Sequence, residues 1–214
     1  KTLNQEIDPH SFGYQVGRML GNVHRVRMPR FGYFDPDKRY AGSWNNLVRY
    51  RVRSALMDMG TRLPSGTKAM IGALISRVSF PESDPRLLHH DIHEGNLLQQ
   101  EGKLTGIVDW THAIGGDPES DVALAFDGNS DRYRTGLLAG YQEVRRVSAG
   151  FDVRAAMYQL VEHTCVLAHL DENDEEFQMY ASQERKDIDR LLERCQKSLR
   201  MWDWVRVMVR RSMG

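Results

Sequence analysis

Apolar residues recur at three- and four-residue spacing along most of this chain, which is the pattern of helices with one buried face. The first such face predicts a helix that ends near His24, and its apolar positions are Phe12, Val16, Met19, Leu20 and Val23. Residues 29–42 interrupt the pattern and are predicted to form a loop. Further helices are predicted over residues 47–59, 67–78, 119–127, 132–147, 153–170 and 177–211.

Between residues 87 and 108 the pattern changes to short apolar runs around a polar loop and a turn. Leu87-Leu88 leads into the loop and Leu97-Leu98 leaves it. Glu101-Gly102 then separates this run from a strand predicted over residues 104–108, which is typical of a β-hairpin. The fold class predicted is therefore mainly α with a small β-hairpin.

The hairpin region carries three polar residues suited to phosphoryl transfer. Asn96 follows Asp91 by five residues, and Asp109 follows Asn96 by thirteen. Catalysis of this reaction is mostly positioning and charge neutralisation, with one residue that orients and deprotonates the acceptor hydroxyl. Because Mg²⁺ prefers oxygen ligands, an amide and a carboxylate brought together by the turn suit it. We therefore predict that Asn96 and Asp109 bind Mg²⁺ and that Asp91 is the base.

The same segment resembles the catalytic core of the aminoglycoside phosphotransferase and choline kinase group, within the protein-kinase-like fold. The family pattern is His-Gly-Asp-hydrophobic-His-x-x-Asn, then hydrophobic-Asp-Trp/Phe-Glu, then Gly-Asp-Pro-x-x-Asp-hydrophobic-Ala. The chain follows it at residues 89–96 and 108–111 and matches it fully at 116–123. His90 stands where the family has Gly, and Thr111 where it has an acidic residue. Neither position carries a chemical role in the family.

The resemblance implies roles for further residues and for the nucleotide. ATP is the expected donor, with GTP as an alternative, held through Mg²⁺ at Asn96 and Asp109. His93 either lies near the acceptor or the phosphates, as a catalytic residue would, or only supports the loop. Three residues are expected to give structural support by fixing the loop or starting the next helix: His89, Asp117 and Asp121.

Each of these residues also has a simpler interpretation. Asp91 can be a loop residue that caps its own backbone, and Asn96 a turn residue after Gly95. Asp109 can be a cap at the end of its strand. Asp121 can be a first-turn carboxylate favoured by the helix dipole. His90 is assigned no role.

The resemblance further implies that residues 1–214 form the helical carboxy-terminal lobe of a two-lobed kinase. Its catalytic core would span residues 87–126 and its acceptor-side helices 130–214. The sequence contains no Gly-rich phosphate loop and no strand Lys for the nucleotide phosphates, which the family carries in an amino-terminal lobe. We therefore expect that lobe to be absent from this sequence. The surface of residues 1–214 that would face it is expected to be covered by the missing lobe or by another chain. Residues 1–214 alone are expected not to turn over ATP.

An acidic run lies between the last two predicted helices, where the family builds its acceptor pocket. The candidate acceptor residues within it are Asp171, Asp174 and Glu175. A polycationic small molecule, such as an aminoglycoside antibiotic, is drawn to such a surface. The alternative is a solvated acidic loop that caps the next helix. Choline and other amino alcohols, macrolides, sugars and amino acids remain alternative acceptors.

Composition and charge limit the kinds of protein and partner that fit this sequence. With 214 residues, 41% hydrophobic and 27% charged, the chain has the composition of an ordinary globular protein. A formal net charge of zero argues against a nucleic-acid partner held by phosphate neutralisation. Neither a membrane-length apolar run nor a signal-peptide pattern is found, so a cytoplasmic protein is expected. Cys165 and Cys195 fall within predicted helices and are expected to be unpaired thiols.

Two other functions compete with a kinase. A kinase-like lobe can persist as a non-catalytic binding module, although intact Asp91, Asn96 and Asp109 argue against it. A metallohydrolase would use His89, His90, Asp91 and His93 as a metal cluster. That alternative leaves Asn96 and residues 116–123 unexplained.

Overall fold

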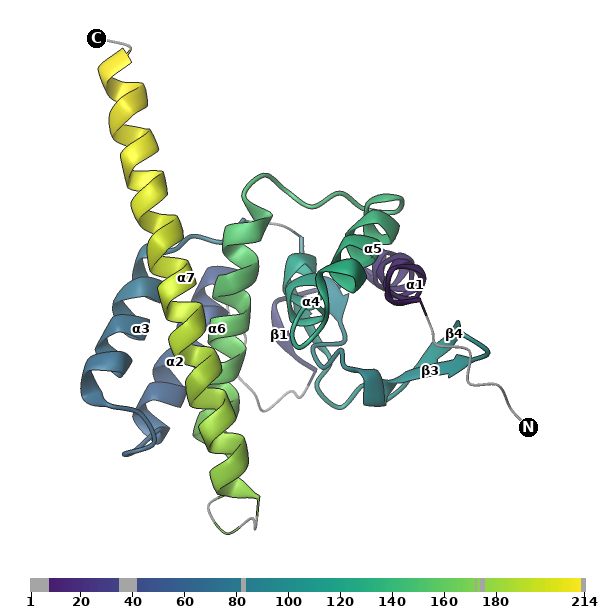
Figure 1. Cartoon of the computed structure of the whole chain (residues 1–214), viewed down its shortest axis with the longest axis horizontal. Helices are drawn as coiled ribbons and strands as arrows, with labels where there is room; N and C mark the ends of the chain where they lie inside the picture. The colour runs from purple at the N-terminus through teal and green to yellow at the C-terminus, as the bar shows by residue number, and fades with distance from the viewer. Residues whose placement is uncertain (1–7, 35–41, 82–83, 172, 174–175, 213–214) are drawn as a thin grey trace. The chain divides into compact units, whose positions relative to one another are not determined.

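The structure is a computed structural model that describes residues 8–34, 42–81, 84–171, 173 and 176–212, without the side chains of residues 199–212. The described chain is mainly helical with small sheets, as predicted. It divides into two compact units, one built from residues 8–47 and 80–151 and the other from residues 48–79 and 152–212 (Figure 1). Among the described residues, no helix is both long enough and apolar enough to span a bilayer.

The first unit combines three helices with two small antiparallel sheets. The helices are α1 (Pro9–Val23), α4 (Pro118–Leu124) and α5 (Asp131–Gln142). One sheet has the strand order β1-β5-β2, formed by Gly32–Tyr33, Ile114–Gly116 and Arg86–Leu88. The other sheet is the hairpin of β3 (Leu97–Gln100) and β4 (Lys103–Ile107).

The helices α1 and α5 pack with their backbones almost in contact. A Cβ on Gly17 would lie 2.0 Å from the carbonyl oxygen of Leu137, and one on Gly140 would lie 2.0 Å from that of Tyr14. Gly13 and Gly136 repeat this arrangement one turn away, so glycines on both helices form the contact. Such spacing of small residues allows close helix packing, with Cα–H···O contacts between the backbones.

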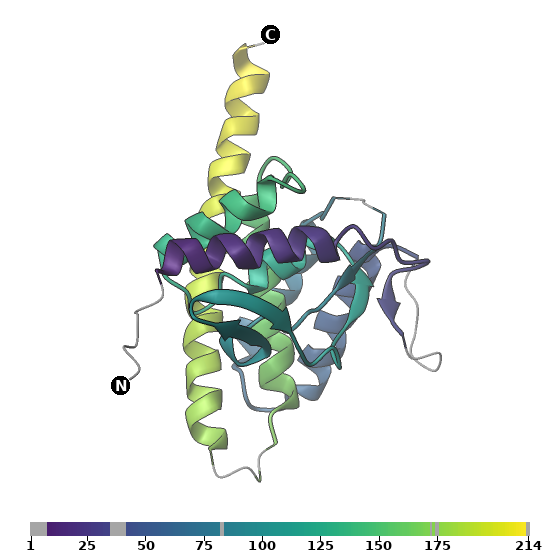
Figure 2. The same ribbon diagram turned by 90° about the vertical axis from the view of Figure 1, so that its right-hand side faces the viewer.

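The predicted hairpin is confirmed. Glu101 and Gly102 have φ values of 51° and 75°, as the two central residues of a type I′ turn require. Figure 2 shows α1 running alongside the hairpin of β3 and β4, and the side chain of Gln15 on α1 is hydrogen-bonded to the hairpin. Its Nε2 donates to the Gly102 carbonyl and its Oε1 accepts from the Leu104 N–H, both at 3.0 Å. Since these are main-chain partners, Gln15 pairs with the hairpin as a neighbouring strand would.

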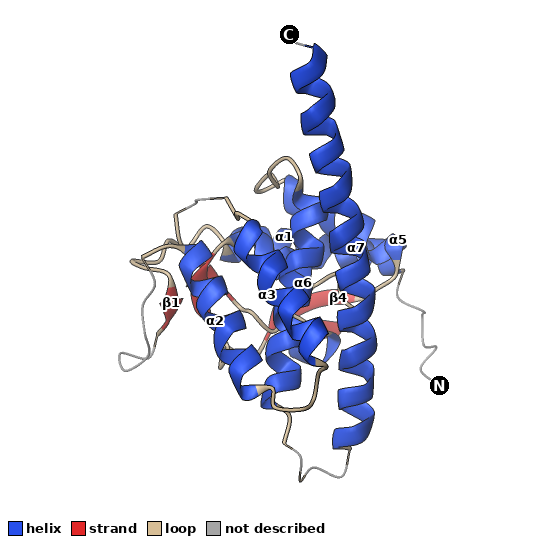
Figure 3. Ribbon diagram, turned by 90° about the vertical axis from the view of Figure 1, so that its left-hand side faces the viewer, coloured by secondary structure: helices blue, strands red, loops and turns tan. Residues whose placement is uncertain are grey.

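The second unit consists of α3 (Ser65–Arg77), α7 (Phe177–Ser212), nearly all of α6 (Phe151–His169) and most of α2 (Trp44–Asp58) (Figure 3). Its buried apolar side chains include Val52, Met59, Ile71, Leu160, Leu167 and Ile188. Ion pairs connect α2 to α6 through Arg51 and Glu162, at 2.9 Å, and α6 to α7 through His163 and Glu184, at 2.7 Å. Cys165 and Cys195 are free and buried, as predicted.

All the predicted helices are present, with shifted ends. The largest shift is in α5, which was predicted to continue to residue 147 and ends at Gln142. Buried Glu119 explains the early end, since its Oε1 accepts from both the backbone N–H and the hydroxyl of Ser148, at 2.6 and 2.7 Å. These bonds hold residue 148 in a loop. The strands β1 and β5 were not predicted, because two or three residues are too few to show an alternating pattern.

Candidate active site

The loop that begins the first motif, residues 89–93, lies between β2 and a single 3₁₀ turn, η1 (Glu94–Asn96), which leads directly into β3. Buried Asp121 on α4 holds the start of this loop. Its Oδ2 accepts from the His89 N–H at 2.7 Å, and its Oδ1 accepts from the His90 N–H at 2.9 Å. Asp117 caps α4 by accepting from the Glu119 N–H at 3.1 Å, which fixes the helix that carries Asp121.

The carboxylate of Asp121 is fully buried and yet favoured in its charged form. Burial alone raises the pKa of Asp121, but the hydrogen bond from the His24 ring, the nearby His24 and His90 side chains and the His89 N–H outweigh it. On balance the pKa of Asp121 is lowered. The backbone of His90 has a φ of 66°, in the left-handed region, at the position where the resemblance expected Gly.

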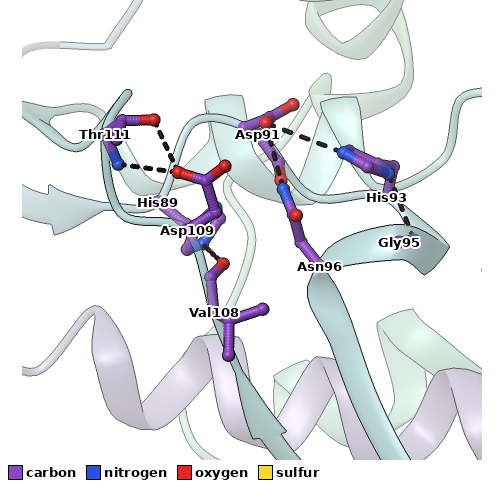
Figure 4. A network of polar contacts seen from close by, with 8 residues as sticks. All are labelled: His89, Asp91, His93, Gly95, Asn96, Val108, Asp109 and Thr111. Carbon is purple, nitrogen blue, oxygen red and sulfur yellow. Dashed lines mark hydrogen bonds and ion pairs between the residues drawn. The ribbon is translucent and has the colours of Figure 1, made fainter.

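His89 connects the loop to the segment that carries Asp109. Its Nε2 lies 2.8 Å from the Val108 carbonyl oxygen, which can only accept, so Nε2 carries the proton. The ring also packs edge-on against Trp110, with 4.7 Å between ring centroids. His89 therefore fixes the position of Val108, the residue directly before Asp109 (Figure 4).

Asn96 fixes Asp91. Its Nδ2 donates to both the backbone carbonyl and the Oδ2 of Asp91, at 3.0 Å each. None of the described residues donates a hydrogen bond to Asn96 Oδ1 or to Asp91 Oδ1. The Asp91 side chain is 37% exposed, so its free oxygen is accessible to an acceptor hydroxyl.

The hairpin brings Asn96 next to the segment before Asp109. The Val108 N–H donates to the Asn96 carbonyl at 3.0 Å, and Leu97 pairs with Ile107. Asp109 is exposed and has a φ of 61°, a conformation that Asp tolerates better than most residues. A Mg²⁺ ion would find an amide oxygen and a carboxylate here, a donor set that suits it.

The carboxylate of Asp109 is held by Thr111. Its Oδ1 accepts from the Thr111 hydroxyl at 2.6 Å and from the Thr111 N–H at 3.3 Å. The hydroxyl bond, followed by the backbone bond and the nearby His112 and His89, lowers the pKa of Asp109. Thr111 thus keeps Asp109 ionised and leaves Oδ2 for a ligand.

His93 also lies near the Asp91 carboxylate. Its Nδ1 accepts from the Gly95 N–H at 3.1 Å, so the ring proton is on Nε2, which lies 3.7 Å from Asp91 Oδ2. That separation is too long for a direct hydrogen bond. Figure 4 shows Asn96 and His93 directed at the same carboxylate.

Two further hypotheses from the sequence concern a metal cluster and the acidic run. Among the described residues, no three His, Cys, Asp or Glu side chains are grouped so that they can hold one metal ion, which argues against a metallohydrolase. The acidic run does connect α6 to α7, in the second unit. Asp171 there accepts from the N–H and the side-chain amide of Asn173, at 2.9 Å each, and these bonds lower the pKa of Asp171. Asp174 and Glu175 lie outside the described residues.

The sequence reasoning missed two buried residues beside the site, His24 and Tyr141. His24 follows Val23 at the end of α1, and its Nε2 lies 3.2 Å from Asp121 Oδ2. One signal was available, because His24 continues the four-residue spacing of Val16 and Leu20 on the buried face of α1. A polar residue at such a position needs a buried hydrogen-bond partner.

Known proteins resemble this chain in both sequence and fold. A model of the phosphotransferase enzyme family (APH) matches residues 2–160. The chain belongs to this family. No curated protein sequence matches it significantly.

Solved structures of the same family share the fold. A protein described as a fructosamine-3-kinase from Thermobifida fusca YX-ER1 is 19% identical with a TM-score of 0.71, over 92% of this chain and 68% of that one. A choline/ethanolamine kinase family protein from Mesorhizobium loti is 17% identical with a TM-score of 0.60, over 92% of this chain and 71% of that one. A thermostable mutant of aminoglycoside phosphotransferase APH(4)-Ia, bound to ADP and hygromycin B, is 18% identical with a TM-score of 0.58, over 90% of this chain and 65% of that one.

These likenesses confirm the protein-kinase-like fold that the motifs implied. The chain spans about two thirds of the length of each of these three structures. The three are named for different acceptors, so the fold leaves the acceptor of this protein unresolved.

Proposed function

We propose that this protein is an ATP-dependent phosphotransferase that transfers the γ-phosphate to a hydroxyl group of a small molecule. The observation that carries the proposal is the geometry of Asp91, whose Oδ2 is held by Asn96 while Oδ1 stays open. A base that is fixed on one oxygen and free on the other is positioned to receive a proton from an incoming hydroxyl.

In the proposed reaction Asp91 Oδ1 takes the proton of the acceptor hydroxyl. The acceptor oxygen forms a bond to the γ-phosphorus, and the bond from that phosphorus to the β–γ bridging oxygen breaks, so that ADP leaves with the electron pair. His93 lies beside this carboxylate, with its Nε2 3.7 Å from Asp91 Oδ2, and leaves Oδ1 open to the acceptor.

Asn96 Oδ1 and Asp109 would hold Mg²⁺, with Thr111 keeping Asp109 ionised. Bound there, the ion would neutralise the phosphate charge that develops during transfer. ATP is the donor that the family suggests, with GTP as the alternative. The amide of Asn96 would serve both parts of the site, because its nitrogen holds Asp91 and its oxygen would bind the metal.

For the acceptor we propose an aminoglycoside-type antibiotic, bound with the help of the acidic run at Asp171, Asp174 and Glu175. Multiple negative charges attract a polycation at long range. Neutralising the three residues together should raise KM for an aminoglycoside, and the effect should shrink at high salt because exposed charges are screened. Neutralising exposed Asp189 on α7 is the control. An unchanged KM, or a neutral macrolide as the best substrate, would reject this acceptor.

Kinases of fructosamines and of choline or ethanolamine share the fold, so a metabolite with an amino group is the second candidate class. A phosphotransfer screen should therefore include aminoglycosides, amino alcohols and fructosamines, and should use the full-length protein.

The deciding experiment is Asp91→Asn in the full-length protein. We expect kcat to fall by roughly two to four decades, the usual scale for a general base, with nucleotide affinity almost unchanged. The control is Asp131→Asn, which changes an exposed carboxylate in the first turn of α5. If Asp91→Asn turns over at the wild-type rate, Asp91 is not the base. If wild type binds Mg·ATP and phosphorylates none of the acceptors, the protein is a binding module.

A further inference from the structure

A buried chain of three side chains lies behind the catalytic loop. His24 at the end of α1, Asp121 on α4 and Tyr141 on α5 are each fully buried. His24 Nε2 lies 3.2 Å from Asp121 Oδ2, and His24 Nδ1 lies 3.0 Å from the Tyr141 hydroxyl. Figure 1 shows the three helices that carry them gathered in the first unit.

The hydrogen-bonding capacity of each group fixes the position of the His24 proton. The Asp121 carboxylate can only accept, so His24 Nε2 carries a proton. The only described partner of the Tyr141 hydroxyl is His24 Nδ1, and burial raises the pKa of Tyr141, so the hydroxyl keeps its proton. In a singly protonated ring Nδ1 can accept from this buried O–H, which has no other acceptor among the described residues. Tyr141 therefore donates to Nδ1 and keeps the His24 proton on Nε2.

Asp121 connects His24 to the backbone of the loop. Its two oxygens together receive three donors, namely the His24 ring and the successive backbone N–H groups of His89 and His90. Holding both N–H groups on one carboxylate fixes the left-handed backbone at His90, where φ is 66°. The residue after this bend is Asp91. The direction in which Asp91 leaves the loop therefore depends on the orientation of the Asp121 carboxylate.

We propose that His24 and Tyr141 are positioning residues for Asp91. Tyr141 fixes the tautomer of His24, His24 orients Asp121, and Asp121 sets the backbone bend that aims Asp91 at the acceptor. Neither His24 nor Tyr141 contacts the nucleotide or the acceptor in this scheme. The assignment rests on the proposed role of Asp91, although the hydrogen-bond chain itself can be tested without any reaction.

The test compares Tyr141→Phe with Tyr133→Phe in the full-length protein. Both remove one phenolic hydroxyl from a buried ring on α5, but the Tyr133 hydroxyl has no partner in the chain that the structure describes. Two quantities are measured: the hydrogen-exchange rates of the His89 and His90 amides, and kcat together with KM for the nucleotide. For Tyr141→Phe we expect those two amides to exchange about tenfold faster, with kcat lower by about tenfold and KM little changed. Tyr133→Phe should change neither quantity.

Variants of His24 complete the test. His24→Gln retains an N–H for Asp121 and an oxygen for Tyr141, so it should keep most of the turnover that His24→Leu loses. Because the residues act in one chain, Tyr141→Phe should add little to the loss already caused by His24→Leu. If His24→Leu does not fold, Tyr141→Phe and His24→Gln still decide the matter.

Three outcomes would overturn the proposal. These are wild-type exchange at His89 and His90 in Tyr141→Phe, faster exchange there with unchanged kcat, and faster exchange spread equally over all of α1 and α5. The last would mean a general loss of stability. Failure of the proposed function gives a different result, since wild type would then show no transfer while the exchange effect at His89 and His90 persisted.

Discussion

The side-chain nitrogen of Asn96 donates to both the carbonyl oxygen and the carboxylate Oδ2 of Asp91, at 3.0 Å each. Both hydrogens of the Asn96 amide can therefore be used by Asp91, whereas none of the described residues donates a hydrogen bond to the Asn96 Oδ1. In the proposed reaction this side chain would both orient Asp91 as the base and bind Mg²⁺, a combination for which an amide is suited and a carboxylate is not.

Exchanging the Asn96 amide for a carboxylate should separate these two tasks. Asn96→Asp keeps an oxygen for Mg²⁺ but removes both hydrogen bonds and places a second negative charge beside Asp91 Oδ2. We expect kcat to fall by about a hundredfold while Mg·ATP still binds. Asn129→Asp is a matched control, since Asn129 Nδ2 also donates twice, to the carbonyls of Ala125 and Asp127. Loss of Mg·ATP binding with kcat retained would mean that Asn96 serves the metal alone.

The proposed metal site makes a second prediction, and Thr111 allows a milder substitution to be compared with the loss of Asp109. Asp109→Ala should abolish Mg²⁺-dependent nucleotide binding. Thr111→Val removes the 2.6 Å bond to Asp109 and should raise the Mg²⁺ requirement by about two- to tenfold, because the pKa of Asp109 is then no longer held down. The increase should be largest in acid, where Asp109 begins to bind protons.

Titration of Mg²⁺ against nucleotide binding at several pH values measures both effects. Thr111→Ser retains the hydroxyl and should behave as wild type. Unchanged Mg·ATP binding in Asp109→Ala would place the metal elsewhere.

The sequence predicted most of the fold because its signals are local. Helical periodicity and the Glu101-Gly102 turn each depend on neighbouring residues, and both were found as predicted. The sheet of β1, β5 and β2 depends on pairing between distant segments, such as Gly32 with Gly115, and short strands carry no periodic signal for it. The end of α5 was missed for the same reason, since the distant carboxylate of Glu119 sets it.

The sequence likewise predicted those residues of the candidate site that are close together along the chain, but not those brought together by packing. Spacing and motif were enough to nominate Asp91, Asn96 and Asp109, because they lie on one loop and hairpin. His24 and Tyr141 were not nominated, because their relation to the loop exists only once α1, α4 and α5 have packed together. The glycine spacing in α1 and α5 is visible in the sequence, however, and would have indicated that these two helices pack closely.

That close packing makes a third prediction. In Gly17→Ala the new Cβ would stand 2.0 Å from the Leu137 carbonyl oxygen, so the two backbones must separate. We expect the free energy of unfolding to fall by at least about 2–3 kcal/mol. Gly72→Ala is the control, because it also lies inside a helix but its Cβ would meet only Leu56 Cδ1, at 3.8 Å. That variant should be neutral or stabilised by about 0.5–1 kcal/mol. Equal denaturation midpoints for the two variants would show that α1 and α5 do not pack this closely.

The hairpin turn makes a fourth prediction, in the stabilising direction. Glu101 is exposed and has a φ of 51°, a left-handed conformation that Asn adopts more readily than Glu. Glu101→Asn should therefore raise the stability by about 0.5–1 kcal/mol, measured as a higher Tm. Glu101→Ala should bring no gain, because Ala has the same difficulty in the left-handed region. A Tm that rises equally in both variants would attribute the effect to charge, not backbone conformation.

The buried carboxylate of Asp121 makes the last prediction, which concerns pH. Its pKa is lower in the folded protein than in the unfolded chain, because the donors around it outweigh the effect of burial. The folded state therefore binds the Asp121 proton more weakly, so the stabilisation is complete above about pH 4 to 5 and is lost as pH falls through the folded-state pKa.

Asp121→Asn should destabilise the protein by roughly 3–5 kcal/mol at pH 7, because an amide nitrogen then faces backbone N–H donors. Urea denaturation between pH 7 and pH 3 should show this difference shrinking on acidification. Asp8→Asn, at an exposed cap whose pKa is also lowered, should show a much smaller difference. A gap between wild type and Asp121→Asn that stayed constant down to pH 3 would mean that Asp121 binds protons equally in the folded and the unfolded protein, so that its pKa is not lowered by folding.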